Sequence, residues 1–124
     1  MSEARAAKGA AARASGRRSE VLAALVLMAK GYRILGFRLK APQAEIDLLA
    51  WRKDVVVVVE VKRRRTLEEA LCAVNYDQRE RLRRAGLMLA ARRPQLAAAA
   101  VRLDLIALAP GRLPVHIQDA WNGA

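Results

Sequence analysis

The 124-residue sequence has few cysteine, histidine or aromatic side chains: one cysteine, one histidine, two tryptophans, two tyrosines and one phenylalanine. A lone Cys72 excludes an intrachain disulfide and a cysteine-rich zinc site. A lone His116 cannot complete a nucleophilic dyad or a zinc site, and its place beside Pro114 predicts a surface or edge residue. A glycine-rich phosphate loop is also missing. These absences predict a mainly aliphatic core and no chemistry that depends on thiols or on a histidine base.

The sequence also lacks a hydrophobic run long enough to cross a membrane. The apolar stretch over residues 21–29 is far shorter than the about 20 residues that a span needs. A signal peptide is not expected, because Glu20 interrupts the entry to this stretch, no small-residue cleavage site follows, and the chain continues into Lys30 and Gly31. With its single cysteine, the chain is predicted to be cytoplasmic and to have no membrane partner.

Acidic residues are scarce relative to basic ones. There are 12 of Asp and Glu against 23 of Lys and Arg, which gives a formal net charge of +11. A small basic domain suggests a polyanionic partner, with nucleic acid ahead of an anionic membrane. Enrichment in both arginine and alanine also fits a bias in genomic base composition. A small protein-interaction module with incidental basicity is therefore one alternative.

The length predicts a single domain. Residues 1–15 are alanine-rich with scattered basic residues, and we expect a flexible basic N-terminal arm there, either a frayed helix or disordered, before one domain over residues 16–124. The expected elements are a helix over 17–30 with Ser19 as its N-cap and Gly31 after its end; strands over 32–40, weakened or bulged at Gly36, 44–51 and 55–62; helices that begin after Thr66 and Asn75, the second reaching about Arg93; a strand over 101–109; and an edge strand over 115–118.

A run of five valines that ends in two charged residues is the central feature of the sequence. Residues 55–62 read VVVVVEVK, and such a β-branched run predicts a strand buried on both faces of a sheet. Because strand side chains alternate, Val58, Glu60 and Lys62 share one face. Burying a charge costs several kcal/mol unless it is paired or bound to a metal, so Glu60 and Lys62 call for a partner.

The turn before this strand decides whether Asp47 can be that partner. In an antiparallel pair, directly opposed residues share a face. A two-residue turn of Lys53 and Asp54 pairs Asp47 with Glu60, and a four-residue turn leaves the two carboxylates diagonal on the same face. A turn of odd length puts them on opposite faces. We expect an even length, although no glycine identifies the turn type.

Two ionised carboxylates side by side repel each other, and a hard divalent cation removes this repulsion. Mg²⁺ (or Mn²⁺) takes oxygen ligands from one or two carboxylates, waters and phosphates, which predicts a metal at Asp47 and Glu60. Lys62 would orient the attacking water or neutralise charge at the phosphorus. Glu20, at the entrance of the first helix, is expected to bind a second metal or a metal-bound water. Each residue also has an ordinary interpretation as a salt-bridge or helix-dipole residue.

Together these motifs resemble a known family. A helix with Glu20, then GYRIL, AEIDLLA and VVEVKRR, then a helix with Gln78, is similar to the YraN family of small bacterial proteins over roughly residues 17–93 and more weakly over 101–109. That family is similar in turn to archaeal-type Holliday junction resolvases and other PD-(D/E)XK nucleases. The resemblance implies an α/β fold with a restriction-endonuclease-like αβββαβ core and a mixed central sheet flanked by helices. It also implies a set of site residues: Asp47 and Glu60 as metal ligands, Lys62 as the catalytic lysine, Glu20 as the helix carboxylate and Gln78 as an auxiliary residue.

The sequence departs from the family pattern in three places. Ala44 stands where a glycine is usual, Val58 where an aromatic residue is common, and Phe37 and Arg38 where an arginine and an asparagine are usual. None of these changes removes a charged site residue.

The sequence therefore predicts a Mg²⁺-dependent endonuclease that hydrolyses phosphodiesters in DNA, including branched or junction DNA. We expect phosphate contacts, which position the substrate without reading bases, from Arg63, Arg64, Arg65, Arg79 and Arg83. Similarity to junction resolvases suggests a homodimer. The alternative from a different class is a non-catalytic nucleic-acid-binding protein on a nuclease scaffold.

Overall fold

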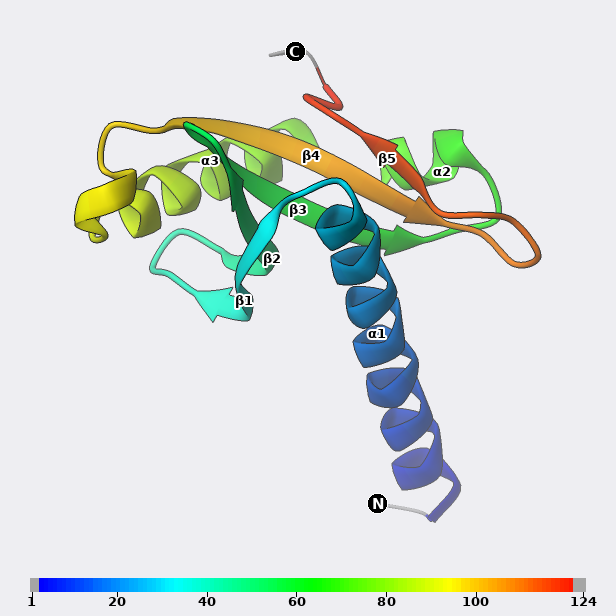
Figure 1. Cartoon of the computed structure of the whole chain (residues 1–124). Coiled ribbons are helices and arrows are strands. Elements are labelled where there is room, and N and C mark those ends of the chain that lie inside the picture. The colour runs from blue at the N-terminus through cyan, green and yellow to red at the C-terminus, as the bar shows by residue number, and fades with distance from the viewer. Residues whose placement is uncertain (1–2, 122–124) are drawn as a thin grey trace.

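A five-stranded mixed sheet forms the centre of the fold, with helices on both faces (Figure 1). This computed structural model describes residues 3–121, with side chains from residue 16 onward. In chain order the elements are α1 (Glu3–Ala29), β1 (Arg33–Lys40), β2 (Glu45–Arg52), β3 (Val55–Arg63), α2 (Leu67–Cys72), α3 (Tyr76–Ala91), the 3₁₀ helix η1 (Pro94–Leu96), β4 (Ala100–Leu108) and β5 (Val115–Ile117). The predicted fold class is confirmed, with the αβββαβ order supplemented by α2, η1 and β5.

The strands lie in the order β1-β2-β3-β4-β5. The first three form an antiparallel meander, β4 runs parallel to β3, and β5 pairs antiparallel with β4 at the edge. The connection between the parallel strands passes through α2 and α3, as a parallel pair requires. Because β3 is central, both of its faces are covered, which is why its sequence is a continuous run of valines.

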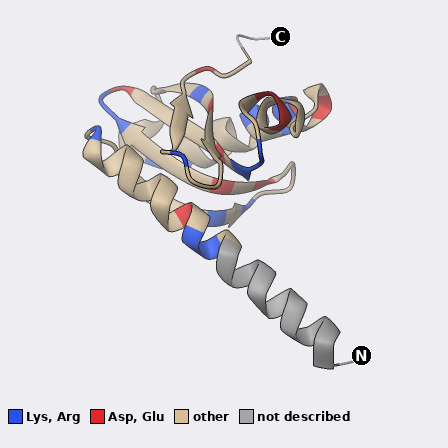
Figure 2. Cartoon of the chain, turned by 90° about the vertical axis from the view of Figure 1, so that its right-hand side faces the viewer, with Lys and Arg blue, Asp and Glu red and all other residues tan. Residues whose placement is uncertain are grey.

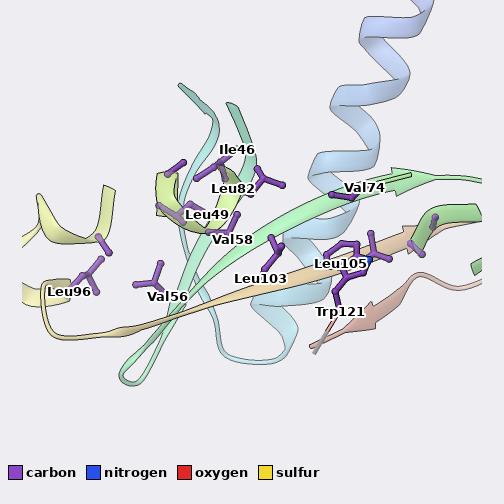
Figure 3. Packing of buried hydrophobic residues seen from close by; sticks show 14 residues of the cluster. Ile46, Leu49, Val56, Val58, Val74, Leu82, Leu96, Leu103, Leu105 and Trp121 are labelled. Atoms are coloured by element: carbon purple, nitrogen blue, oxygen red, sulfur yellow. The ribbon is translucent and has the colours of Figure 1, made fainter. Parts of the chain in front are cut away.

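The two faces of β3 belong to two separate hydrophobic clusters. Val56 and Val58 lie in the cluster on the α3 side, seen from close by in Figure 3, whereas Val57 and Val59 pack with α1. On the α3 side, a Cβ placed on Gly86 would lie 2.4 Å from Val58 Cγ2, so this glycine lets the helix approach the strand closely. The buried hydrophobic residues of the described chain are aliphatic apart from Tyr32 and Trp121, which confirms the predicted aliphatic core.

The predicted helix and strand boundaries are largely confirmed. The Thr66 hydroxyl accepts from the Glu69 N–H at 3.2 Å, and Asn75 Oδ1 accepts from the Gln78 N–H at 2.8 Å. Gly31 has a φ of +90° directly after α1 ends. The β1–β2 register shifts between Ile34 and Gly36, which confirms the irregularity expected at that glycine.

The prediction of Ser19 as an N-cap is wrong. Helix α1 already begins at Glu3, so Ser19 lies inside it and is buried. The alanine-rich residues upstream are strong helix formers, and they extend the helix past a residue that would otherwise cap it. The flexible character of residues 1–15 stays a prediction, because their side chains lie outside the described part of the chain.

The outer face of α1 carries exposed apolar residues. Val21, Leu25 and Met28 are all more than half exposed, on the side of the helix away from the sheet. Within residues 3–121 no helix combines the length and the apolarity that a membrane span needs. The homodimer suggested by resemblance stays a prediction.

Candidate metal centre

The β2–β3 hairpin brings Asp47 and Glu60 together. Lys53 and Asp54 form a two-residue turn, which confirms the predicted even length, since Arg52 pairs with Val55 and the ladder continues to Leu48 opposite Val59. The next opposed pair in this register is Asp47 and Glu60. The turn has no glycine, and Lys53 itself adopts the left-handed backbone with a φ of +56°, which the sequence did not indicate.

The strands part at this pair, and the Asp47 side chain takes over a backbone hydrogen bond. The β2–β3 backbone pairing ends at Leu48, and one residue further Asp47 Oδ2 accepts from the Val61 N–H at 3.0 Å. The carboxylate therefore satisfies a β3 backbone donor that the β2 main chain no longer reaches. This hydrogen bond fixes the Asp47 side chain against the end of β3.

Glu60 is almost completely buried, at 2% exposure, and Lys62 is its nearest cationic partner. Lys62 Nζ lies 3.6 Å from Glu60 Oε2, and the side chain of Lys62 is 21% exposed. Burial, followed by the charge of Asp47, raises the pKa of Glu60 to about 8, and the charge of Lys62 only partly offsets this. Burial also raises the pKa of Asp47, against the lowering effect of the Val61 N–H. When both carboxylates are ionised, the pair carries more negative charge than one lysine neutralises, and this excess favours the uptake of a proton or a cation.

This donor set fits a divalent cation held by two protein carboxylates. Mg²⁺ commonly takes one or two carboxylates and completes its shell with waters and phosphate oxygens, and Asp47 and Glu60 supply that number. A third protein ligand is not assembled: within the described part of the chain, no group of three Asp, Glu, His or Cys side chains is placed to hold a metal ion.

Glu20 lies near this pair but is engaged elsewhere. It projects from α1 and is 8% exposed, and Arg38 Nε donates to its two carboxylate oxygens at 2.7 and 3.1 Å. Arg38 Nη2 donates to Oε1 as well. Glu20 shares with Asp47, but not with Glu60 or Lys62, an open cavity of about 510 Å³. That cavity is lined by Gly16, Arg17, Ser19, Glu20, Arg38, Glu45, Asp47, Val61 and Arg63.

Gln78 lies in the first turn of α3, four residues before the buried Leu82 on the inward stripe of that helix. Its side chain is half-buried, and within residues 16–121 the structure gives it no hydrogen bond to Asp47 or Glu60. Its position is compatible with an auxiliary role but does not itself indicate one.

The five predicted DNA-contacting arginines fall into two groups. Arg63, Arg64 and Arg65 are exposed at the end of β3. Arg63 lines the cavity that contains Asp47, whereas Arg64 and Arg65 line a separate cavity. Arg79 is half-buried with its guanidinium over the rings of Tyr76 and Trp121, and Arg83 donates to Glu80 at 2.6 Å. The run at the end of β3 is therefore the part of the set that is presented to solvent. Figure 2 shows basic residues gathered where the described part of α1 passes this end of the sheet.

Three residues of the cavity were missed by sequence reasoning: Arg17, Arg38 and Glu45. Of the three, the sequence drew attention only to Arg38, as a departure from the family pattern. Their grouping depends on the packing of α1 against β1 and β2, which no local pattern predicts.

A second buried charged cluster was also missed. Asp104 on β4 is fully buried and accepts from Arg102 Nε at 2.7 Å, from the Asp119 N–H at 3.0 Å and from His116 Nε2 at 2.8 Å. The prediction of His116 as a surface or edge residue is half right, because β5 is the edge strand but the side chain is 1% exposed. A carboxylate inside the apolar run of β4 was the available signal, by the same argument that drew attention to Glu60.

A mixed sheet with this topology, in which an aspartate near the start of β2 lies opposite a Glu-x-Lys triplet near the end of β3, defines a restriction-endonuclease-like domain. The chain belongs to the Uncharacterised protein family UPF0102, the YraN family, whose model matches residues 19–108. It is 70% identical to a UPF0102 protein of Caulobacter sp. (strain K31) over 115 residues, which cover 93% of this chain and 83% of that protein.

Other relatives carry the same name. A UPF0102 protein of Caulobacter vibrioides (strain NA1000 / CB15N) is 65% identical over 120 residues, covering 97% of this chain and 96% of that protein. UPF0102 protein amb4503 of Paramagnetospirillum magneticum is 48% identical over 116 residues, covering 90% of both chains. The resemblance inferred from the motifs is thus confirmed at the level of the family.

Proposed function

We propose that this protein is a Mg²⁺-dependent endonuclease that hydrolyses phosphodiesters in DNA, including branched or junction DNA. The observation that supports it best is the pairing of half-buried Asp47 with buried Glu60, which one lysine leaves incompletely neutralised. Such a pair is costly as a structural feature, whereas it suits a site that binds a cation. Perturbed carboxylates with a specific partner are also typical of functional sites.

Each residue of the candidate site has a defined part in this reaction. When bound, Mg²⁺ (or Mn²⁺) supplies Lewis acidity at the phosphate and a water of lowered pKa. Asp47 and Glu60 would hold the ion, and the Val61 N–H keeps Asp47 in place. Lys62 would donate to the water or to the phosphate oxygen that gains charge.

The proposed partner is the phosphate backbone of DNA. A net charge of +11 and the exposed run Arg63–Arg65, whose first residue lines the cavity, support it, since phosphate contacts provide affinity without sequence readout. A DNA substrate and a single unpaired cysteine are consistent with the cytoplasm as the place of action.

The test is cleavage of linear, flapped and four-way DNA with Mg²⁺ or Mn²⁺ by the wild type and by Asp47→Asn, Glu60→Gln and Lys62→Ala. We expect each substitution to lower the rate by about 100-fold or more, because each removes a ligand or the charged donor. Asp54→Asn is the matched control, since its exposed carboxylate lies in the β2–β3 turn, at the opposite end of β3 from Glu60 and Lys62, and it should keep the wild-type rate. Equal cleavage by all variants would point to a contaminating nuclease and contradict the proposal.

A second candidate function is DNA binding without cleavage. The ion pair of Glu20 with Arg38 favours it, because the third carboxylate of the site is engaged and no three-ligand group is assembled among the described residues. DNA binding that persists under every metal condition with no cleavage of any substrate would select this alternative.

A further inference from the structure

Arg38 forms part of the wall of the candidate site in the free protein. Its Nε and Nη2 groups engage both oxygens of the Glu20 carboxylate, which is itself 8% exposed. Bidentate contacts of this kind are among the strongest that a carboxylate forms. Glu20 therefore lies at the edge of the cavity that it shares with Asp47, but it is not free to take a cation.

The backbone of Arg38 is unusual in the same place. Its φ is +49°, in the left-handed region that non-glycine residues other than Asn and Asp rarely adopt. Arg38 lies two residues after Gly36, where the register of β1 shifts, so its backbone belongs to an irregular part of the strand. Strained conformations of bulky residues are found preferentially at functional sites, where surrounding structure holds them.

Among the residues whose side chains the structure describes, the charges that line the cavity balance. Its walls carry three carboxylates and three guanidinium groups: Glu20, Glu45, Asp47, Arg17, Arg38 and Arg63. The hydrogen bond to Glu20, with the charges of Glu45 and Asp47, raises the pKa of Arg38, so this guanidinium lies in the field of all three carboxylates. Adding a dication at Asp47 would make a guanidinium in that position repulsive.

We propose that Arg38 is a latch on Glu20: it acts as a built-in counter-ion in the free protein and transfers to a DNA phosphodiester when substrate and a divalent cation enter together. This inference rests on the proposed function and adds regulation of the same site. The side chain is 43% exposed, so it can leave Glu20 toward the open cavity. Its planar fork matches phosphate oxygens as well as it matches a carboxylate. Glu20 then becomes available to the cation or to its waters.

The first measurement is Mn²⁺ binding by calorimetry, without DNA, to the wild type and to Arg38→Gln. Removing the guanidinium releases the Glu20 carboxylate for the cation and should tighten Mn²⁺ binding by about tenfold. Arg33→Gln is the matched control, because Arg33 lies on the same strand over the Trp51 ring and outside the cavity, and it should leave the affinity unchanged. The gain should vanish in Glu20→Gln, so that the double variant binds no tighter than Glu20→Gln alone.

The second measurement is binding of four-way DNA with Ca²⁺ as the cation. Because Arg38 becomes a phosphate contact, Arg38→Gln should weaken DNA binding several-fold and lower the slope of log affinity against log salt by about one. A residue that only stabilises the fold would change neither the Mn²⁺ affinity nor this slope.

The outcomes separate the latch from the metal site. If Asp47→Asn abolishes Mn²⁺ binding but Arg38→Gln leaves it unchanged, the metal site stands and the latch is wrong. If Mn²⁺ binds to Arg38→Gln and not to the wild type, the latch is supported in its strongest form. If neither protein binds Mn²⁺, both ideas fail. Should Arg38→Gln not fold, as judged by circular dichroism, Arg38→Gly suits the left-handed backbone and replaces it.

Discussion

At the scale of single residues, two buried carboxylates define the electrostatics of this protein in opposite ways. Asp104 is satisfied on every side, by Arg102, His116 and a backbone N–H, whereas Glu60 has only one lysine and faces a second carboxylate. A buried carboxylate whose hydrogen bonds and charge are fully matched is typical of a structural group. One whose charge is only partly neutralised is typical of a group that binds a ligand. The two carboxylates, although they lie in the same sheet, should therefore change the stability of the protein with pH in different directions.

Glu60 should make the metal-free protein less stable as the pH rises. Its pKa is raised from 4.5 to about 8, so between these values the folded state binds a proton that the unfolded state has lost. The stabilising contribution of the Glu60 proton is fully present below pH 4.5. As the pH rises from there to about 8, the free energy of unfolding falls by about 2 to 4 kcal/mol. Urea denaturation in EDTA across that range measures it, and Glu60→Gln should flatten the slope. An unchanged slope in that variant would show that Glu60 is not the group.

Asp104 should act in the opposite direction. Burial alone would raise its pKa, but hydrogen bonds from His116 and Arg102 outweigh burial and leave the pKa lowered. Its contribution is therefore present above its usual pKa and is lost as the pH falls through the lowered value. Asp104→Asn should reduce the free energy of unfolding by about 3 kcal/mol at neutral pH, because the partly buried charge of Arg102 loses its partner. Asp119→Asn, at an exposed position whose backbone makes the contact, should be near neutral.

At the scale of elements, short sequence patterns predicted the features that depend on neighbouring residues, namely helix caps, helix ends and turn length. The caps at Thr66 and Asn75, the end of α1 at Gly31 and the even length of the β2–β3 turn could all be predicted from short stretches. The juxtaposition of Asp47 and Glu60 followed because a turn of even length fixes strand parity. By contrast, the contact between Glu20 and Arg38 spans two elements, and it depends on how α1 lies on the sheet rather than on any pattern.

Two helical glycines should respond in opposite ways to the same substitution. A Cβ on Gly86 would meet Val58 at 2.4 Å, so Gly86→Ala should destabilise by about 1 to 3 kcal/mol despite the better helix propensity of alanine. Gly16 in α1 has nothing within 4 Å of its added Cβ, and Gly16→Ala should stabilise by up to about 1 kcal/mol. Thermal unfolding of the two variants compares them directly. Stabilisation by Gly86→Ala would mean that α3 does not approach β3 as closely as described.

At the scale of the whole molecule, some basic side chains are exposed to solvent and others are engaged in internal ion pairs. The net charge of +11 suggested nucleic acid from the sequence alone, but the structure engages part of the basic residues in internal contacts, such as Arg83 with Glu80 and Arg102 with Asp104. The exposed run Arg63–Arg65 begins at the last residue of β3, and Arg63 lines the cavity that contains Asp47. Phosphate binding and the proposed chemistry are therefore expected at the same end of the sheet.

This arrangement predicts which arginines determine the salt dependence of DNA binding. Removing one arginine that binds a phosphate reduces the slope of log affinity against log salt by about 0.9 on duplex DNA. Replacing Arg63, Arg64 and Arg65 together by glutamine should lower the slope by about two to three, while Arg83→Gln should change it little because Glu80 already neutralises that side chain. Fluorescence anisotropy at several salt concentrations measures both. Equal slopes for the triple variant and the wild type would place the DNA on another face, and a wild-type affinity that is insensitive to salt would show that the basicity of the chain does not serve phosphate binding.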